Sequence, residues 1–347
     1  MLIHPLVFKL HKALRASLRQ GEHYLLAVSG GSDSMALAAA CAALQRDGWG
    51  RFSVCHVEHG LRGEESLRDM ALVQRFCAEQ QLPCYVQQVD VHGLVASEGL
   101  SIEAAARQLR HEVLGRVLLE SEAKAVVFAH NRDDQAETML LRLLRGTSLK
   151  GLRGIMPESD MGLHPLLGFS HRELAEYCRL QGVHYAKDST NDDLAYSRNR
   201  VRHEILPYLE KHFNSNIKLT LARMAEQLRY DDEYLECQAM AAYAEAKNVP
   251  KSPGLPELPM NEHMDFLQGS KPYELVFSAT KLQALEPALR RRVLREGYRS
   301  LALAELDYER TLALERLVLQ RAGGKLVQLP QNVIAIYKNK QLIIKKQ

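Results

Sequence analysis

The chain has 347 residues, of which 46% are hydrophobic and 25% are charged, and its formal net charge is +3. These proportions are ordinary for a soluble globular protein, and the length is sufficient for two domains with separate cores. So mild a charge does not by itself predict a nucleic-acid partner, and no run approaches the roughly 20 continuous apolar residues of a membrane helix, so we expect no membrane segment.

The six cysteines indicate the compartment. They form no CxxC pair and show no metal-ligand spacing, and several lie in apolar runs, as buried free thiols do. This pattern suits a reducing cytoplasm better than a secreted disulfide framework, so we expect a cytoplasmic protein. The sequence leaves the oligomeric state open, with a homodimer among the alternatives.

Up to about residue 130, apolar β-rich runs alternate with helical periodicity. The amphipathic stretch 3–20 lacks the serine enrichment of a transit peptide and is interpreted as a covering helix. Strands are expected at 24–28, 52–57, 84–89 and 125–129, and helices at 35–44, 65–81, 102–121 and 133–145. This alternation predicts an α/β fold with a parallel, Rossmann-like sheet covered by helices on both faces.

The segment Ser29-Gly30-Gly31-Ser32-Asp33-Ser34 joins the first expected strand to the helix after it. Its glycines allow a tight turn and close approach of a ligand, and the first N–H groups of the helix favour an anion. No Gly-Lys-Ser/Thr ends the segment, so it is not a Walker A loop, and it is not the Gly-x-Gly-x-x-Gly turn of dinucleotide folds. For six residues alone, an ordinary turn of an α/β fold stays an alternative.

Acidic residues open the helix that follows the fourth expected strand. Asp133, Asp134 and Glu137 lie in its first turns, where the helix dipole alone would favour them. Asp134 and Glu137 also share one face, beside the strand ends where parallel sheets bind ligands. There they could hold an ammonium group or, together with phosphates, a Mg²⁺ ion. We therefore expect the loop 29–34 and the segment 130–134 to line one crevice.

Basic residues and histidines supply further candidates. Arg107 and Arg110, on one expected helix, could reach a phosphate or could be merely exposed. The segment 56–63 is better explained as a nucleotide-contacting loop than as a metal site, because no third ligand has a recognised spacing. Arginines cluster at 198–202 and at 290–299, which suits phosphate recognition, although a solvated helix face is the commoner explanation of a single cluster.

The second half of the chain predicts a different organisation. Residues 146–167 are expected to form a loop, and a helix over 170–181 begins with Ser170 as N-cap and Glu173 completing a capping box. A long helical pattern at 217–247 precedes a proline-rich break at 249–259. Helices are then expected near 279–300 and 305–321, and short strands near 325–329, 333–337 and 341–344. We expect three parts: an N-terminal domain over 1–215, a helical connector over 216–250 and a small α+β domain over 251–347.

Taken together, these segments resemble the tRNA(Ile)-lysidine synthases, a family of PP-loop ATP pyrophosphatases. The loop 29–34 matches the Ser-Gly-Gly-x-Asp-Ser pattern of the PP-loop group. The strings specific to the family are Asp133-Asp134-Gln135-Ala136-Glu137-Thr138 and Arg198-Asn199-Arg200-Val201-Arg202. The further matches are His56-Val57-Glu58-His59-Gly60-Leu61-Arg62-Gly63, Glu65, Ser66, Asp69, Ala106-Arg107, Arg110, Leu140-Leu141-Arg142, Arg145-Gly146, Gly151-Leu152, Pro165-Leu166-Leu167, Asp188, Asn191, Gly324-Lys325, Leu329-Pro330 and Leu342-Ile343-Ile344.

The resemblance implies a two-step reaction. The wobble cytidine of a tRNA(Ile) with a CAU anticodon attacks the α-phosphate of ATP through its C2 oxygen and releases pyrophosphate. The ε-amine of free L-lysine then attacks C2 and expels AMP, leaving lysidine. The N-terminal part would be the catalytic PP-loop domain and the C-terminal part would bind tRNA. A further C-terminal domain of longer members has no counterpart here, so the chain resembles a short form.

The resemblance also implies roles for individual residues. ATP would be bound by Ser29, Gly30, Gly31, Ser32, Asp33, Ser34, His56, Arg107 and His130. Asp33 would also help to hold Mg²⁺, and the catalytic set would be Asp33, Arg107, Arg198 and Arg200. Asp134 and Glu137 would grip lysine and aim its amine. For tRNA binding we expect Arg198, Arg202, Arg290, Arg291 and Arg292.

Three positions depart from the family pattern. Asn131 stands where a histidine is usual, His111 where a tyrosine follows the arginine, and His164 where an arginine precedes Pro-Leu-Leu. These departures weaken any role assigned to those three positions and leave the loop, the acidic pair and the arginine cluster intact.

Other function classes predict other features. A PP-loop tRNA thiolase would need cysteines for sulfur or an iron–sulfur cluster, usually as CxxC pairs. A small-molecule PP-loop ligase would not need the arginine clusters or the C-terminal module. A non-catalytic tRNA- or nucleotide-binding module would not require Asp33, Asp134 and Glu137.

Overall fold

The structure, a computed structural model, describes residues 4–61, 63–186, 197–247, 274–302, 304–320 and 325–347. Contacts divide the chain into two compact units, Met1–Arg229 and Tyr230–Gln347, with the boundary inside helix α11 (Ile217–Ala246). The expected three-part division stays a prediction, and its proline-rich break at 249–259 lies outside the described residues. Arg62, Asp188, Asn191 and Gly324 lie outside them as well.

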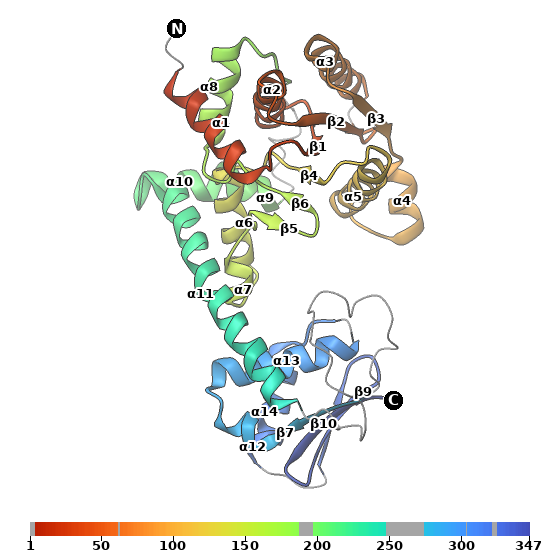
Figure 1. Cartoon of the computed structure of the whole chain (residues 1–347), viewed down its shortest axis with the longest axis vertical. Coiled ribbons are helices and arrows are strands. Elements are labelled where there is room, and N and C mark those ends of the chain that lie inside the picture. Colours follow the sequence, from red (N-terminus) through yellow and green to blue (C-terminus); the bar gives the residue numbers. More distant parts are fainter. Residues whose placement is uncertain (1–3, 62, 187–196, 248–273, 303, 321–324) are drawn as a thin grey trace. The chain divides into compact units, whose positions relative to one another are not determined.

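The first unit contains a six-stranded sheet in the order β3-β2-β1-β4-β6-β5 (Figure 1). Its strands are β1 (His23–Ala27), β2 (Arg51–Glu58), β3 (Cys84–Gln88), β4 (Ala125–Val127), β5 (Glu158–Ser159) and β6 (Gly162–Leu163). All neighbouring pairs are parallel except β5 and β6. The four predicted strands are confirmed, and β5 and β6 lie in the stretch that we expected to be a loop, because two-residue strands carry no periodicity.

Helices cover both faces of this sheet, as predicted. Consecutive residues of β1 show the division: Leu26 belongs to one apolar cluster and Leu25 to another. The Leu26 cluster includes residues of α1 (Pro5–Ser17), α2 (Ser32–Arg46), α3 (Glu64–Gln80) and α8 (His171–Gln181), whereas the Leu25 cluster includes α5 (Ile102–Glu120). Because side chains alternate along a strand, these two clusters lie on opposite faces of the sheet.

Local signals explain where the helices begin. The side chain of Ser170 accepts the N–H of Glu173, and the carboxylate of Glu173 accepts the N–H of Ser170, so the predicted capping box of α8 is confirmed. The remaining helices before residue 187 are α4 (Val91–Glu98), α6 (Arg132–Leu144) and α7 (Leu149–Leu152). From residue 197 the chain is again helical, in α9 (Ser197–Arg200), a π-helical stretch η2 (Val201–Ile205) and α10 (Leu206–His212).

The second unit is an α+β module with its own core, as predicted. Its antiparallel sheet has the order β7-β10-β9-β8, formed by β7 (Glu274–Ser278), β8 (Leu326–Leu329), β9 (Val333–Lys338) and β10 (Gln341–Lys346). Its helices are α12 (Ala279–Ala284), α13 (Pro287–Ala302) and α14 (Tyr308–Leu319). The single helix expected at 279–300 is therefore two, because a proline disfavours helical backbone at the residue before it and starts a new helix well.

None of the helices in the described part of the chain is long and apolar enough to cross a membrane.

Gly162, in β6, provides a test of how this strand packs beside β4. It has a φ of +136°, and a Cβ at this position would overlap the carbonyl oxygen of Val126. We expect Gly162→Ala to lower the free energy of unfolding by about 2–4 kcal/mol, because it adds backbone strain to a steric clash. Gly168→Ala is the matched control, since a Cβ at position 168 would have no neighbouring atom within 4 Å. Equal urea midpoints for the two variants would contradict this packing.

Candidate active site

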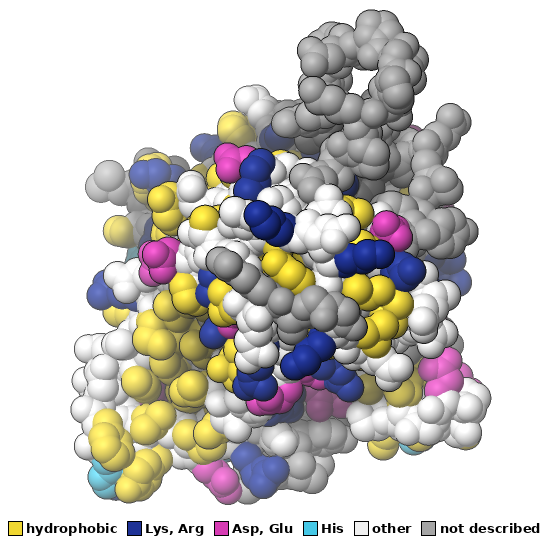
Figure 2. Space-filling model, turned by 90° about the horizontal axis from the view of Figure 1, so that it is seen from below, with side chains coloured by type: hydrophobic (Ala, Val, Ile, Leu, Met, Phe, Trp, Pro, Cys, Tyr) yellow, Lys and Arg dark blue, Asp and Glu magenta, His cyan; other side chains and the backbone are white. Residues whose placement is uncertain are grey.

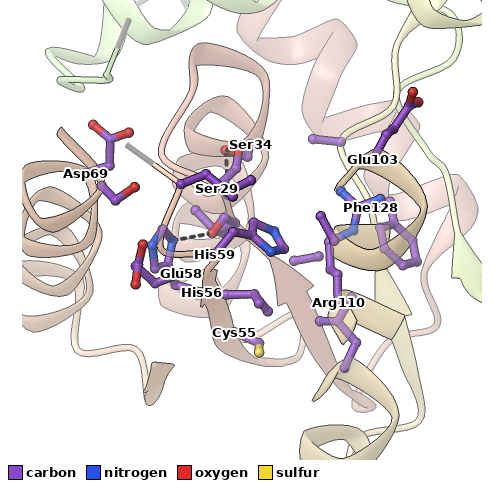
Figure 3. A pocket seen from close by; sticks show the side chains of 18 of the residues that line it. Ser29, Ser34, Cys55, His56, Glu58, His59, Asp69, Glu103, Arg110 and Phe128 are labelled. Atoms are coloured by element: carbon purple, nitrogen blue, oxygen red, sulfur yellow. Dashed lines mark hydrogen bonds between the residues drawn. The ribbon is translucent and has the colours of Figure 1, made fainter. Parts of the chain in front are cut away.

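A cavity of about 690 Å³ opens at the carboxyl ends of β1, β2 and β4 (Figure 3). The motif residues that line it are Ser29, Asp33, Ser34, His56, Val57, Glu58, His59, Leu61, Ser66, Asp69, Ala106, Arg110, Arg198 and Asn199, and His130 lines it too. Segments a hundred residues apart thus meet in one crevice, as the parallel sheet predicts. The expectation is confirmed for Ser29, Asp33, Ser34 and His130. The other residues of 29–34 and 130–134, and Glu137, are not among those that line the cavity.

The loop after β1 wraps around the hydroxyl of Ser34. This oxygen accepts the backbone N–H groups of Ser29 and Gly30 at 3.2 Å each and donates to the carbonyl of Gly31 at 3.0 Å. Gly30 has a φ of +98°, a backbone conformation that residues other than glycine rarely adopt. Gly31 gives α2 no side-chain cap, so the helix offers its first N–H groups and its dipole to an anion in the cavity.

Asp33 faces a histidine that our sequence interpretation missed. The Nδ1 atom of His171 lies 2.9 Å and 3.2 Å from the two carboxylate oxygens of Asp33. Burial raises the pKa of Asp33 despite this contact, and the hydrogen bond to Asp33 raises the pKa of His171. His171 is the first residue of α8, and its backbone N–H donates to Asp133. In the sequence, the predicted helix start at Ser170 is the only signal that indicates the position of His171.

The acidic pair is occupied by two arginines. The Nη2 atom of Arg198 lies 2.7 Å from Asp134 Oδ1, and its Nε atom lies 2.7 Å from Glu137 Oε2. Arg202 adds bonds from Nε and Nη2 to Glu137, at 2.5 Å and 3.0 Å. The Glu137 side chain is only 1% exposed. Arg198 therefore lines the cavity and also holds both carboxylates.

The departure at Asn131 has a structural explanation. Asn131 is buried and is the N-cap of α6, where its Oδ1 accepts the N–H groups of Asp133 and Asp134. The Asp134 carboxylate in turn accepts the backbone N–H of Asn131, which completes a capping box. One oxygen of Asp134 therefore caps the helix and the other holds Arg198. This shared use fixes the orientation of the Asp134 side chain.

Two aromatic side chains, Phe128 and His130, line another wall of the cavity, and the ring of His164 packs against both. The rings of Phe128, His130 and His164 lie with centroids 4.9 to 5.7 Å apart. Burial, together with the neighbouring His164, lowers the pKa of His130 to about 3. In the described part of the chain, Nδ1 of His130 and of His164 is buried without a hydrogen-bond partner. His130 is thus a neutral imidazole whose Nδ1 atom is available for a hydrogen bond with a ligand.

The arginines of α5 differ in their placement. Arg107, which the resemblance assigned to ATP, is exposed and is not among the residues that line the cavity. Arg110 lines the wall opposite Glu58 and Asp69 (Figure 3), and its Nε is buried without a hydrogen-bond partner among the described residues. Geometry therefore favours Arg110 over Arg107 as the phosphate contact. Arg200 is exposed, and its Nη2 lies 3.4 Å from Ser197 Oγ.

The arginines of α13 are engaged within the second unit. Arg290 is buried, and its guanidinium donates to Glu315 and to the carbonyl of Leu285. Arg291 also pairs with Glu315, and Arg292 pairs with Asp232 and Glu236. On the face drawn in Figure 2, Lys and Arg side chains stand among hydrophobic and acidic ones and form no continuous basic patch. We therefore withdraw Arg290 from the expected tRNA surface, because its donors stabilise the fold.

His130 provides a test of the site's electrostatics. Because its folded pKa is about 3, well below the 6.5 of a free imidazole, we expect no titration of this ring by NMR between pH 5 and 8. In that range the imidazole of His130 gains a proton in the unfolded state and not in the folded state. Acidification below about pH 6.5 therefore lowers the free energy of unfolding through His130. A chemical-shift midpoint near pH 6.5 for His130 would contradict the buried, neutral ring.

Comparison with known proteins identifies the fold and the two modules. Residues 4–209 match the PP-loop domain family, and residues 277–340 match the TilS substrate binding domain family. The chain also resembles a solved structure, the U34-tRNA thiolase NcsA from Methanococcus maripaludis with its 4Fe-4S cluster, with a TM-score of 0.54 and 17% identity. That match covers 64% of this chain and 79% of the thiolase, and it shows a shared fold.

Curated relatives identify the family. The tRNA(Ile)-lysidine synthase of Clostridioides difficile strain 630 is 30% identical over 94% of this chain and 67% of its own length. The tRNA(Ile)-lysidine synthase of Thermosynechococcus vestitus is 36% identical over 66% of each chain. The chain spans between about half and two thirds of the length of the curated relatives that it matches. By both the family matches and these relatives, the chain belongs to the tRNA(Ile)-lysidine synthase family of PP-loop proteins.

Proposed function

We propose that the chain is a tRNA-modifying ligase that makes lysidine. Its substrates are ATP, free L-lysine and the wobble cytidine of a tRNA(Ile) with a CAU anticodon, and it acts in the cytoplasm, where these meet. One observation carries the proposal: Arg198 lines the same cavity as residues of the PP-loop and also pairs with both acidic side chains, Asp134 and Glu137. An ATP site and an ammonium site are thus within reach of each other.

The first step is adenylation of the base. The C2 oxygen of the cytidine attacks the α-phosphorus of ATP, and pyrophosphate leaves. The first turn of α2 and the loop 29–34 receive the leaving pyrophosphate, and Arg110 on the opposite wall stabilises charge on the phosphates. The neutral His130 and the ring of Phe128 offer the nucleoside an apolar wall with one free polar atom.

Magnesium would accompany ATP. No group of three or more His, Cys, Asp or Glu able to hold a metal ion exists among the described residues. Mg²⁺ bound with a nucleotide needs only one or two carboxylates, because phosphates and water complete its coordination, and Asp33 fits that part. There the ion would spread the charge of the leaving pyrophosphate.

The second step joins lysine to the base. The ε-amine of lysine, after losing its proton, attacks C2 of the adenylated cytidine, and AMP leaves. We infer that Asp134 and Glu137 hold lysine through an ammonium group, which requires Arg198 to move off them. Phosphates in the cavity supply the negative charge that draws Arg198 away, since a guanidinium binds phosphate and carboxylate with the same fork.

This exchange predicts coupled binding. We expect lysine to bind at least tenfold more tightly when a non-hydrolysable ATP analogue occupies the cavity, because the analogue releases the acidic pair from Arg198. By reciprocity, lysine should tighten binding of the analogue by the same factor. Calorimetric titration of lysine with and without the analogue measures the effect. Equal lysine affinities in the two titrations would contradict the exchange.

The thiolase alternative is disfavoured by the cysteines. Cys55 is the cysteine that lines the cavity, and burial raises its pKa to about 12, which suits a buried thiol and not a sulfur-transfer nucleophile. Cys41 and Cys178 are buried, and burial raises the pKa of both. A non-catalytic binding module would not require the acidic pair of Asp134 and Glu137.

The decisive assay follows label from lysine into tRNA. The chain is incubated with ATP, Mg²⁺, labelled lysine and the CAU-anticodon tRNA, and both labelled tRNA and pyrophosphate are measured. Asp134→Asn should raise the KM for lysine by more than tenfold and leave the KM for ATP close to that of the unsubstituted chain. Arg68→Ala, which removes an exposed i,i+4 ion pair with Glu64, is the control. Pyrophosphate release without any transfer of lysine would refute the lysine assignment.

A further inference from the structure

A second cavity in the first unit is lined by four arginines. It has a volume of about 280 Å³ and shares no lining residue with the larger cavity. The arginines come from the start of α6, from the residue after α7 and from α11: Arg132, Arg153, Arg223 and Arg229. Glu226 is the one acidic residue among the described residues that line it. None of these five side chains has a part in the reaction described above.

Two of the four arginines, Arg132 and Arg223, retain hydrogen-bonding capacity that the described residues do not use. Arg132 has its Nε buried without a hydrogen-bond partner in the described part of the chain, and its Nη2 lies 3.6 Å from Glu173. Arg223 is exposed on α11, with no ion-pair partner among the residues that the structure describes. Positive charges held close together raise the free energy of the folded state unless a negative group compensates, and a buried unsatisfied donor adds to it. The pocket therefore has unused capacity for an anion.

The wall that carries Arg153 is firmly anchored. The side chain of Gln135 accepts the N–H of Ile155 and donates to the carbonyls of Arg153 and Ile155. Arg142 donates to the carbonyls of Gly151 and Gly154. Because Gln135 and Arg142 both belong to α6, this loop is fixed on the same helix that presents Arg132. A pocket preorganised in this way binds without first ordering its walls.

We propose that this arginine pocket binds a phosphate group of the RNA backbone. Guanidinium groups suit phosphate because each can donate two parallel hydrogen bonds, and the volume admits a phosphate together with part of its sugar. The inference rests on the proposed function, which makes RNA the substrate. It adds an anchoring point for the tRNA that is separate from the cavity where ATP reacts.

The test combines two substitutions in the pocket, Arg153→Ala and Arg223→Ala. We expect the double variant to bind tRNA on the order of tenfold more weakly and to show a slope of log K against log salt smaller by about one. Its affinity for ATP should not change. Glu226→Gln, which removes the negative charge, should leave tRNA binding as strong or stronger, and Arg68→Ala should have no effect. Filter binding over a salt series measures all these variants.

A second arm identifies the source of the phosphate. With the larger cavity saturated by an ATP analogue, inorganic phosphate should raise the melting temperature of the unsubstituted chain more than that of the double variant. An unchanged tRNA affinity and salt slope in the double variant would overturn the proposal, and a phosphate effect without a tRNA effect would make the pocket a free-anion site. An unsubstituted chain that binds no tRNA would instead contradict the proposed function itself.

Discussion

The carboxylates of Asp134 and Glu137, the first partly buried and the second fully buried, impose the constraint on which the active site depends. A carboxylate such as Glu137, 1% exposed, is stable in its charged form only with cations and hydrogen bonds around it. Arg198 and Arg202 supply them, and so tie α9 and η2 to the first turns of α6. Removing one partner of such a pair costs about 3–5 kcal/mol when both are buried. Here the removal of one partner costs less, because the side chains of both arginines are about one third exposed.

Under the proposed function, the same constraint sets the order in which the two substrates bind. Two guanidiniums already balance two carboxylates, so a lysine ammonium that joined them would leave the site with excess positive charge. ATP brings the negative charge that restores the balance, and Arg198, which lines the cavity, is placed to exchange between carboxylate and phosphate. In the proposed reaction the acidic pair becomes available once the nucleotide is present, and adenylation therefore precedes attack by lysine.

The sequence predicted the elements whose signals are local. Apolar runs located β1 to β4, and the string after β1 located the loop at the cavity, because a strand, a glycine-rich turn and a helix start are all encoded within a few residues. The pairing of Arg198 with Glu137 joins residues 61 positions apart, so spacing could not reveal it. For the same reason the arginines of α13 looked free in the sequence, although Glu315 and Asp232 hold them. His171 was missed because its partner, Asp33, lies 138 residues earlier.

The central claim is that one acidic pair serves Arg198 in the free protein and lysine during the reaction. A crystal structure with L-lysine and a non-hydrolysable ATP analogue tests it most directly. The account predicts a lysine ammonium within hydrogen-bond distance of Asp134 and Glu137, with the guanidinium of Arg198 turned toward the phosphates. Lysine bound elsewhere, with Arg198 still on both carboxylates, would contradict it.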